Sequence, residues 1–361
     1  LAGGVVLDLS PLRRLRCLEA DSGVVEAEAG CVLADLDGEL GAAGRALRLL
    51  PSTCRTATLG GFIAGGSGGI GSLRWGFLRD AGNLLGLEVV TVEREPRLLR
   101  LDPAQSAPLN HAYGTNGILT ALRLPTAAAV AWHQVVVGFD DWRAAVEVAR
   151  ELPTTALLLN ALCLLEAPVA GRMPWPPGCP PPREGEHRLL LLAAPDTLEV
   201  LPRWLGDRRG TPRWQERQGG GRGLPLRELG WNHTTLHWRA QRPDWTYLQM
   251  LLPRPEMPLL EAVRQRWGED LLWHLEGVRQ GGAPRLAALP LVRWRGRADL
   301  EALIDHCRSH GAVIFDPHAL TVEEGGLGAI DADQVAAKAR HDPDGLLNPG
   351  KLRGWLSRSP G

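Results

Sequence analysis

The residues best suited to chemistry lie in a glycine-rich stretch over residues 51–76, which reads PSTCRTATLGGFIAGGSGGIGSLRWG. Eight of its residues are glycine. Because glycine has no side chain, a ligand can approach the backbone closely, and clustered N–H groups form a site for an anion. The stretch therefore predicts binding of a phosphate-bearing ligand.

The spelling of one part of this stretch, Gly66-Ser-Gly-Gly-Ile-Gly71, also satisfies the dinucleotide fingerprint G-x-G-x-x-G. That fingerprint needs a buried strand before it and a helix after it. Residues 59–65 do not read as a buried strand, and Gly76 follows within one turn. A nicotinamide-binding Rossmann site is therefore disfavoured, and a glycine-rich loop without a ligand remains an alternative.

A second candidate site is the segment from Trp231 to Trp238, which contains His233 and His237. A spacing of four places both histidines on one face of either a strand or a helix. Either could act as a general base. The pair could also bind a metal, but the H-E-x-x-H pattern is missing and we predict no metal. Ordinary packing or surface histidines remain an alternative.

Further polar residues could complete a substrate site. His318 stands in a loop with Glu323 and Glu324 as possible partners, and it is a second candidate base or ligand. His274 lies two residues before Glu276, so both point to one face of a strand. A substrate carboxylate could be bound through two parallel hydrogen bonds by Arg279 or by Arg293.

Periodicity and turn residues predict the elements that position these residues. Before residue 128 we expect strands at Val5–Leu9, Val24–Ala29, Leu87–Val92 and Ile118–Leu124, and a helix at Leu33–Ala43 that ends at Gly44. The next elements follow the ferredoxin-like order β-α-β-β-α-β. They are Trp132–Phe139, Asp140–Leu152, Thr155–Leu165, Arg188–Ala193, Pro195–Leu205 and Thr211–Arg217.

A further group of elements follows, without an internal sequence repeat. We expect strands near His233–Trp238, Thr246–Leu252, Leu271–Val278, Leu289–Trp294 and Val313–Phe315, and helices near Leu259–Trp267, Asp299–His310 and Asp331–Arg340.

Composition restricts the protein class. The 361 residues are 44% hydrophobic and 22% charged with a net charge of -1, which is ordinary for a globular protein and does not indicate a nucleic acid partner. No apolar run reaches the roughly 18 residues of a membrane span. The six cysteines form no C-x-x-C pair, which favours a reducing, cytoplasmic setting over a zinc knuckle or a redox dithiol.

Four segments together resemble a known family. The stretch from Thr58 to Gly69, followed by Arg74-Trp-Gly and Leu85-Gly-Leu-Glu-Val-Val90, is similar to the second half of the FAD-binding domain of the vanillyl-alcohol-oxidase/PCMH flavoproteins. Tyr113-Gly-Thr-Asn-Gly-Ile-Leu-Thr120 resembles the loop that ends that domain. Asp342-Pro-Asp-Gly-Leu-Leu-Asn-Pro-Gly-Lys351 is similar to the C-terminal signature of the glycolate-oxidase and D-lactate-dehydrogenase branch.

The resemblance implies FAD as the cofactor and roles for the matched positions. Backbone amides at 58–61 and 65–69 would hold the pyrophosphate, with Ser67 and Ser72 as possible hydroxyl donors. Gly117 and Ile118 would present backbone to the adenine end, and Asn348 and Lys351 would lie at the flavin edge. The full set of implied cofactor contacts is Pro51, Thr58, Leu59, Gly60, Gly61, Gly65, Ser67, Gly68, Gly69, Ser72, Gly76, Gly117, Ile118, Asn348 and Lys351.

The resemblance also implies a fold and an activity. The expected fold is α+β, with a PCMH-type FAD-binding domain at 1–127, a ferredoxin-like substrate or cap domain at 128–330, and a C-terminal segment at 331–361 that returns to the flavin. The family's first nucleotide-binding loop should precede Val5–Leu9, so we expect the FAD-binding domain to be incomplete at its N-terminus. The expected function is oxidation of a small 2-hydroxy acid such as glycolate or D-lactate, with His237, His233 or His318 as the base. The alternative is a non-catalytic or weakly FAD-binding subunit that associates with a partner flavoprotein.

Overall fold

The computed structural model describes residues 3–19, 21–219, 223–326 and 328–356. The chain divides into two compact units. The first unit comprises Leu1–Gly68, Phe77–Ala129 and His318–Gly361, and the second comprises Gly69–Gly76 and Val130–Pro317. The glycine-rich stretch thus divides between the two units at residue 68.

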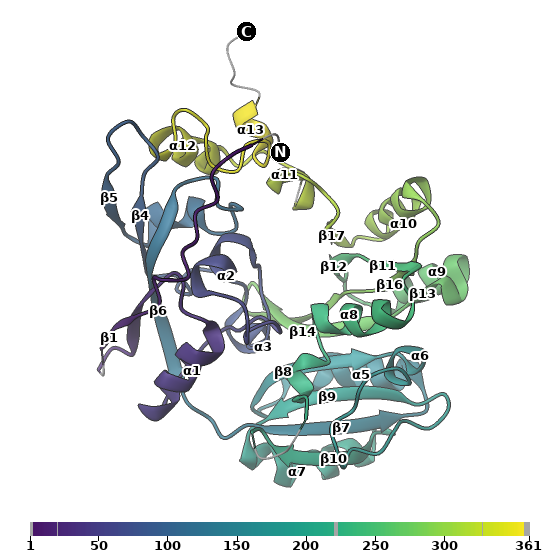
Figure 1. Ribbon diagram of the computed structural model, residues 1–361. Coiled ribbons are helices and arrows are strands. Elements are labelled where there is room, and N and C mark those ends of the chain that lie inside the picture. Colours follow the sequence, from purple (N-terminus) through teal and green to yellow (C-terminus); the bar gives the residue numbers. More distant parts are fainter. Residues whose placement is uncertain (1–2, 20, 220–222, 327, 357–361) are drawn as a thin grey trace. The chain divides into compact units, whose positions relative to one another are not determined.

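The first unit is built on an antiparallel sheet in the order β1-β2-β6-β4-β5 (Figure 1). Its strands are β1 (Leu15–Glu19), β2 (Val24–Glu28), β6 (Ile118–Ala128), β4 (Gly86–Val90) and β5 (Leu98–Leu101), and β3 (Arg45–Leu47) pairs with β6. The apolar side chains of alternate residues, such as Val25, Ala27 and Val89, are fully buried. Helix α1 (Leu33–Ala42) packs on β3, and α2 (Leu59–Gly65) packs on β6.

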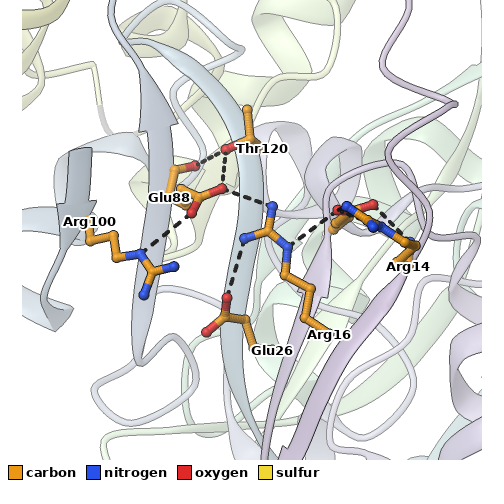
Figure 2. Close-up of polar contacts among 7 residues, drawn as sticks. Arg14, Arg16, Glu26, Glu88, Arg100 and Thr120 are labelled. Atoms are coloured by element: carbon orange, nitrogen blue, oxygen red, sulfur yellow. Dashed lines mark hydrogen bonds and ion pairs between the residues drawn. The ribbon is translucent and has the colours of Figure 1, made fainter. Parts of the chain in front are cut away.

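A network of charged side chains crosses this sheet from β1 to β5 (Figure 2). Arg16 on β1 reaches Glu88 on β4 at 3.0 Å, and also Glu26 and Glu28 on β2 at 3.3 Å each. Arg100 on β5 lies 3.5 Å from Glu88. Glu28 is 1% exposed and Glu88 8%, so these arginines compensate carboxylates that have left water.

The rest of the first unit is helical. It contains α4 (Pro103–Ser106) and three helices near the C-terminus, which are α11 (Val322–Gly325), α12 (Ala332–His341) and α13 (Arg353–Leu356). Asp331 caps α12, because its side chain accepts hydrogen bonds from the N–H groups of Asp333 and Gln334.

The second unit begins its main sheet with the predicted ferredoxin-like motif. The elements run β7 (His133–Phe139), α5 (Trp142–Glu151), β8 (Leu159–Leu165), β9 (His187–Ala193), α7 (Pro195–Gly206) and β10 (Thr211–Arg217). The strand order β10-β7-β9-β8 is the one that this motif requires, and every pair is antiparallel. Asp141 caps α5 through the N–H of Ala144 at 2.7 Å.

The same motif occurs a second time in the unit. The elements β12 (Gln249–Leu251), α9 (Met257–Trp267), β14 (His274–Gln280), β15 (Ala283–Ala288), α10 (Arg297–Ser309) and β17 (Val313–Phe315) again follow β-α-β-β-α-β. Their order β14-β15-β12-β17 is the first order reversed. The second strands of the two motifs, β8 and β14, pair and join both halves into one eight-stranded sheet. The structure therefore contains a repeat that the sequence does not show.

The two faces of this sheet are covered differently. Residues of α5, α7, α9 and α10 share one core with the strands, for example Val148, Leu205, Val263 and Leu303. On the other face, α6 (Ala167–Ala170) and α8 (Asn232–Gln241) contribute Val169 and Trp238 to a second core. A small sheet of β11 (Trp245–Tyr247), β16 (Leu291–Arg293) and β13 (Leu271–Leu272) and the short α3 (Ser72–Trp75) complete the unit.

Two predicted strands are wrong. Val5–Leu9 forms no strand, and Val5 and Val6 are 96% and 95% exposed, because no neighbouring strand pairs with this segment. His233–Trp238 is helical as part of α8, where Thr234 and Trp238, four residues apart, form the buried side.

All six cysteines are free thiols. Within the described ranges, no helix combines the length and the apolar character needed to cross a membrane.

Candidate functional site

The glycine-rich stretch forms helix α2 and the loop that follows it in the first unit. Thr58 caps the helix by accepting a hydrogen bond from Gly61 N–H at 3.3 Å. The N–H groups of Leu59 and Gly60 donate to the carbonyls of Cys31 and Ala29, each at 2.8 Å. The resemblance assigned the amides at 59–61 to the pyrophosphate, but those of Leu59 and Gly60 dock the helix onto the β2–α1 turn and that of Gly61 is used by the Thr58 cap.

The loop after α2 keeps free donors. No hydrogen bond among the described residues uses the N–H groups of Ser67 and Gly68. Ser67 is exposed, whereas Ser72 is fully buried and its hydroxyl oxygen accepts from Gly69 N–H at 2.9 Å. Ser67 and Gly68 are therefore the amides of this stretch best able to bind an anion.

Gly65 and Gly66 differ in the space that surrounds them. A Cβ on Gly66 would lie 2.6 Å from the Phe62 carbonyl oxygen, so packing excludes a side chain there. A Cβ on Gly65 would meet nothing within 4 Å. Gly65 consequently borders open space beside the free amides, where a ligand could lie.

Residues 111–114 pack directly on this loop, and of these the resemblance covered Tyr113 and Gly114 but not His111. His111 N–H donates to the Ile63 carbonyl and Tyr113 N–H to the Ala64 carbonyl, each at 2.8 Å. Both residues have positive φ, 57° for His111 and 52° for Tyr113. Such backbone is costly for side chains other than glycine and concentrates at functional sites.

The imidazole of His111 also contacts the loop. Its Nδ1 lies 2.9 Å from the Gly66 carbonyl oxygen. Because a carbonyl can only accept, Nδ1 carries the hydrogen and Nε2 keeps its lone pair. Burial lowers the pKa of His111, which favours this neutral form. No motif pointed to this histidine, and the unusual backbone could not be read from the sequence.

The C-terminal motif closes onto the same segment. The Asn348 side chain donates to the Tyr113 carbonyl at 2.6 Å, and Asn348 itself has φ 42°. His341 Nδ1 donates to the Asn116 carbonyl at 2.9 Å. Residues 63–68, 111–116 and 341–348 are far apart in the chain and come together in the first unit.

A buried ion pair shapes this motif. Lys338 is 2% exposed and Asp342 0%, and the Lys338 ammonium donates to the Asp342 carboxylate and to the Leu347 carbonyl. Asp342 also accepts from the N–H groups of Leu346 and Leu347, at 2.9 and 2.8 Å. This pair was not predicted from the sequence, although its i,i+4 spacing at the end of a predicted helix was a usable signal.

The remaining cofactor candidates lie at varied depths. Gly117 is buried with φ 129°, and a Cβ there would come within 2.5 Å of Val89. Ile118, Pro51 and Lys351 are half-buried, and the Lys351 carbonyl accepts from Val322 N–H at 2.9 Å. Gly76, with φ 76°, follows α3 in the second unit.

The histidines predicted on the substrate side lie in different units. His233 and His237 share one side of α8 in the second unit, with ring centroids 6.2 Å apart. His237 Nε2 donates to the Glu228 carbonyl at 3.0 Å, which leaves Nδ1 as the acceptor. His318 is exposed, follows β17 and belongs to the first unit.

The two arginines considered for a substrate carboxylate both have partners. Arg279 donates to the carbonyls of Leu73 and Gly282, at 3.1 and 2.6 Å. Arg293 lies 3.5 Å from both Asp244 and Asp270.

Comparison with known proteins identifies the first part of the chain. Residues 1–95 match the family model described as FAD binding domain. Residues 1–95 therefore belong to an FAD-binding domain, and the chain has the PCMH-type fold. The predicted fold class and the predicted cofactor, FAD, are confirmed.

Solved structures share the fold of nearly the whole chain. One structure of alkyldihydroxyacetonephosphate synthase superposes with a TM-score of 0.70 at 13% identity, and another with a TM-score of 0.67 at 12% identity. Each match covers 94% of this chain and 66% of the synthase chain, so the protein spans about two thirds of the length of these structures. No curated protein matches the sequence.

The residues present fit the diphosphate of FAD. Gly65 offers open space, and the neighbouring N–H groups of Ser67 and Gly68 have no partner in the described part of the chain. An anion is the ligand that such a pair of donors accepts.

Proposed function

We propose that this protein is an FAD-dependent oxidoreductase that converts a small 2-hydroxy acid, of the glycolate or D-lactate type, into a 2-oxo acid. The observation that supports this most is the convergence of residues 63–68, 111–116 and 341–348 beside unengaged amides in the FAD-binding unit. We assign FAD binding to 1–127, substrate binding to 128–330, and a return to the flavin to 331–361. Six free thiols fit a cytoplasmic location.

The first unit would hold the cofactor through backbone and one cation. The N–H groups of Ser67 and Gly68 would bind the diphosphate, and the backbone at Gly117 and Ile118 would face the adenine end. Asn348 keeps the 113–114 backbone in place through its bond to Tyr113. Lys351 would place a positive charge near the flavin ring, where negative charge develops on reduction.

FAD, when bound, supplies a hydride acceptor. The substrate loses its C–H hydrogen with the electron pair and its O–H proton to a base. We assign that base to His237, because its Nε2 is held by the Glu228 carbonyl and its Nδ1 is left with a lone pair. His233, on the same side of α8, and His318 are the other candidate bases.

A second function, a non-catalytic or weakly FAD-binding subunit that associates with a partner flavoprotein, is favoured by one observation. Arg279 and Arg293, the arginines considered for a substrate carboxylate, are engaged with carbonyls and aspartates respectively. A 2-hydroxy acid would then need another cation for its carboxylate.

The cofactor site is tested by Gly65→Ala with Gly38→Ala as the matched control. Both are helical glycines of the first unit whose added Cβ meets nothing within 4 Å, so neither substitution should destabilise the fold. We expect Gly65→Ala to weaken FAD binding at least about tenfold, or about 1.4 kcal/mol, because the methyl occupies ligand space. Titration by flavin fluorescence measures this. Equal FAD affinity in both variants would contradict the proposed site.

The activity has its own test. Glycolate and D-lactate are added anaerobically to the FAD-loaded protein while the flavin absorption is followed. Bleaching by either acid, slowed at least about a hundredfold in His237→Ala, supports the enzyme. Normal FAD binding without bleaching, together with copurification of a second flavoprotein, supports the subunit.

A further inference from the structure

A buried group of potential metal ligands lies in the second unit, apart from the residues assigned to FAD. Cys163 on β8 stands directly opposite Glu276 on β14 in the pairing that joins the two ferredoxin-like halves. His274 lies two residues before Glu276 on the same strand face. Cys163 is 5% exposed, His274 0% and Glu276 1%, and one ligand atom from each lies within 4.8 Å of the others.

Among the described residues, no lysine or arginine forms an ion pair with Glu276. Two other buried carboxylates do have a permanent cation, Glu186 with Arg188 at 2.6 Å and Asp342 with Lys338. For Glu276, the ionisable partner among the described residues is His274, whose Nε2 lies 2.7 Å from the carboxylate. The Glu276 carboxylate also accepts from Trp231 N–H at 2.5 Å, which adds a dipole but no charge. A carboxylate buried without a full positive charge is costly.

One nitrogen of the neighbouring His274 imidazole also lacks a hydrogen-bond partner among the described residues. That nitrogen is Nδ1, and it is buried. Burial and the negative charge of Glu276 raise the pKa of the Cys163 thiol. The imidazole nitrogen beside the carboxylate is Nε2, and a bound cation could take the place of its hydrogen between His274 and Glu276.

We propose that Cys163, His274 and Glu276 bind one divalent transition-metal ion of the Zn²⁺ class. Thiolate, imidazole and carboxylate are the ligands that Zn²⁺ prefers. Binding forms a bond between the metal and the Cys163 sulfur, and the thiol proton leaves to solvent. One thiolate and one carboxylate then balance the two positive charges, so the buried site is neutral.

The surroundings provide access and a further coordination position. A small pocket lined by Ile70, Gly230 and Trp231 reaches both Cys163 and Glu276. A Cβ on Gly230 would lie 2.9 Å from the Glu276 carboxylate, so glycine keeps this side of the site open. A water entering through the pocket would complete four ligands. No metal was predicted here, because the pairing of β8 with β14 cannot be read from the sequence.

The test uses the whole protein loaded with Co²⁺ or Zn²⁺. Co²⁺ reports a bound thiolate by a charge-transfer band in the near ultraviolet, and metal analysis after dialysis reports stoichiometry. We expect about one ion per chain in the unaltered protein. Cys163→Ser and Glu276→Gln keep the volumes, and each should weaken binding at least about tenfold. Cys307→Ser is the matched control, since Cys307 is fully buried in α10 of the same unit.

The outcomes separate a metal site from a hydrogen-bonded cluster. A cobalt–thiolate band that Cys163→Ser removes and Cys307→Ser retains supports the proposal. Absence of the band in the unaltered protein, or its retention in Cys163→Ser, overturns it. If Cys163→Ser does not fold, as judged by circular dichroism, the comparison of the unaltered protein with Glu276→Gln decides. Neither readout depends on flavin, so the result is independent of the proposed oxidoreductase function.

Discussion

Replacement of Lys338 by methionine should destabilise the FAD-binding unit strongly, although Lys338 touches no predicted cofactor residue by its side chain. Lys338 is 2% exposed, and its ammonium is the positive charge paired with the fully buried Asp342 carboxylate. Methionine keeps most of the side-chain volume but leaves Asp342 with only the N–H groups of Leu346 and Leu347. An uncompensated buried charge costs about 3–5 kcal/mol.

The loss of stability in Lys338→Met should come from the unpaired Asp342 charge and not from lost packing. Adding Asp342→Asn removes the orphaned charge while an amide oxygen can still accept from the backbone, so the double variant should regain about 1–3 kcal/mol. The control is Arg97→Met, which breaks the 2.7 Å ion pair with Glu93 in the same unit. Arg97 is 56% exposed there, so the loss should not exceed about 1 kcal/mol.

Urea denaturation followed by circular dichroism measures these differences in the free energy of unfolding. The reasoning is refuted if Lys338→Met costs no more than Arg97→Met, because burial would then not amplify the charge. A second refuting result is that the two substitutions act additively. Asp342→Asn would then lower the free energy of unfolding by the same amount in Lys338→Met as in the unaltered protein, which would mean that the pair is not coupled.

Three further results are expected. Arg16→Met should lower the free energy of unfolding by about 1–3 kcal/mol, because Arg16 links Glu88 to Glu28, and urea denaturation measures it. Asn348→Ala should weaken FAD binding about tenfold, by releasing the Tyr113 carbonyl, and unchanged affinity in a fluorescence titration would contradict this. In His111→Asn, the free energy of unfolding should fall less steeply as the pH decreases. Burial lowers the pKa of His111 in the fold, so its contribution is complete above about pH 6.5 and is lost as pH falls toward the folded-state value. Equal slopes between pH 7 and 5 would rule this out.

Local signals predicted most elements of the fold correctly. The helix predicted at Asp140–Leu152 and the strand predicted at Trp132–Phe139 are confirmed as α5 and β7, and the six-element order predicted the ferredoxin-like motif. The strand predicted at 233–238 is wrong, because the segment buries Thr234 and Trp238 at helical spacing. Val5 and Val6 have strand propensity, but a strand also needs a partner.

The sequence alone predicted an anionic, phosphate-bearing ligand, because clustered glycine amides are a local feature. The resemblance of this stretch and of the C-terminal motif to a flavoprotein family implied FAD. The tertiary structure decided which amides are free. It showed that those of Leu59 and Gly60 bind the Ala29–Cys31 backbone, whereas those of Ser67 and Gly68 remain available. It also brought His111 to the loop and Cys163 to Glu276, because strand pairing and loop docking join residues that no spacing along the chain relates.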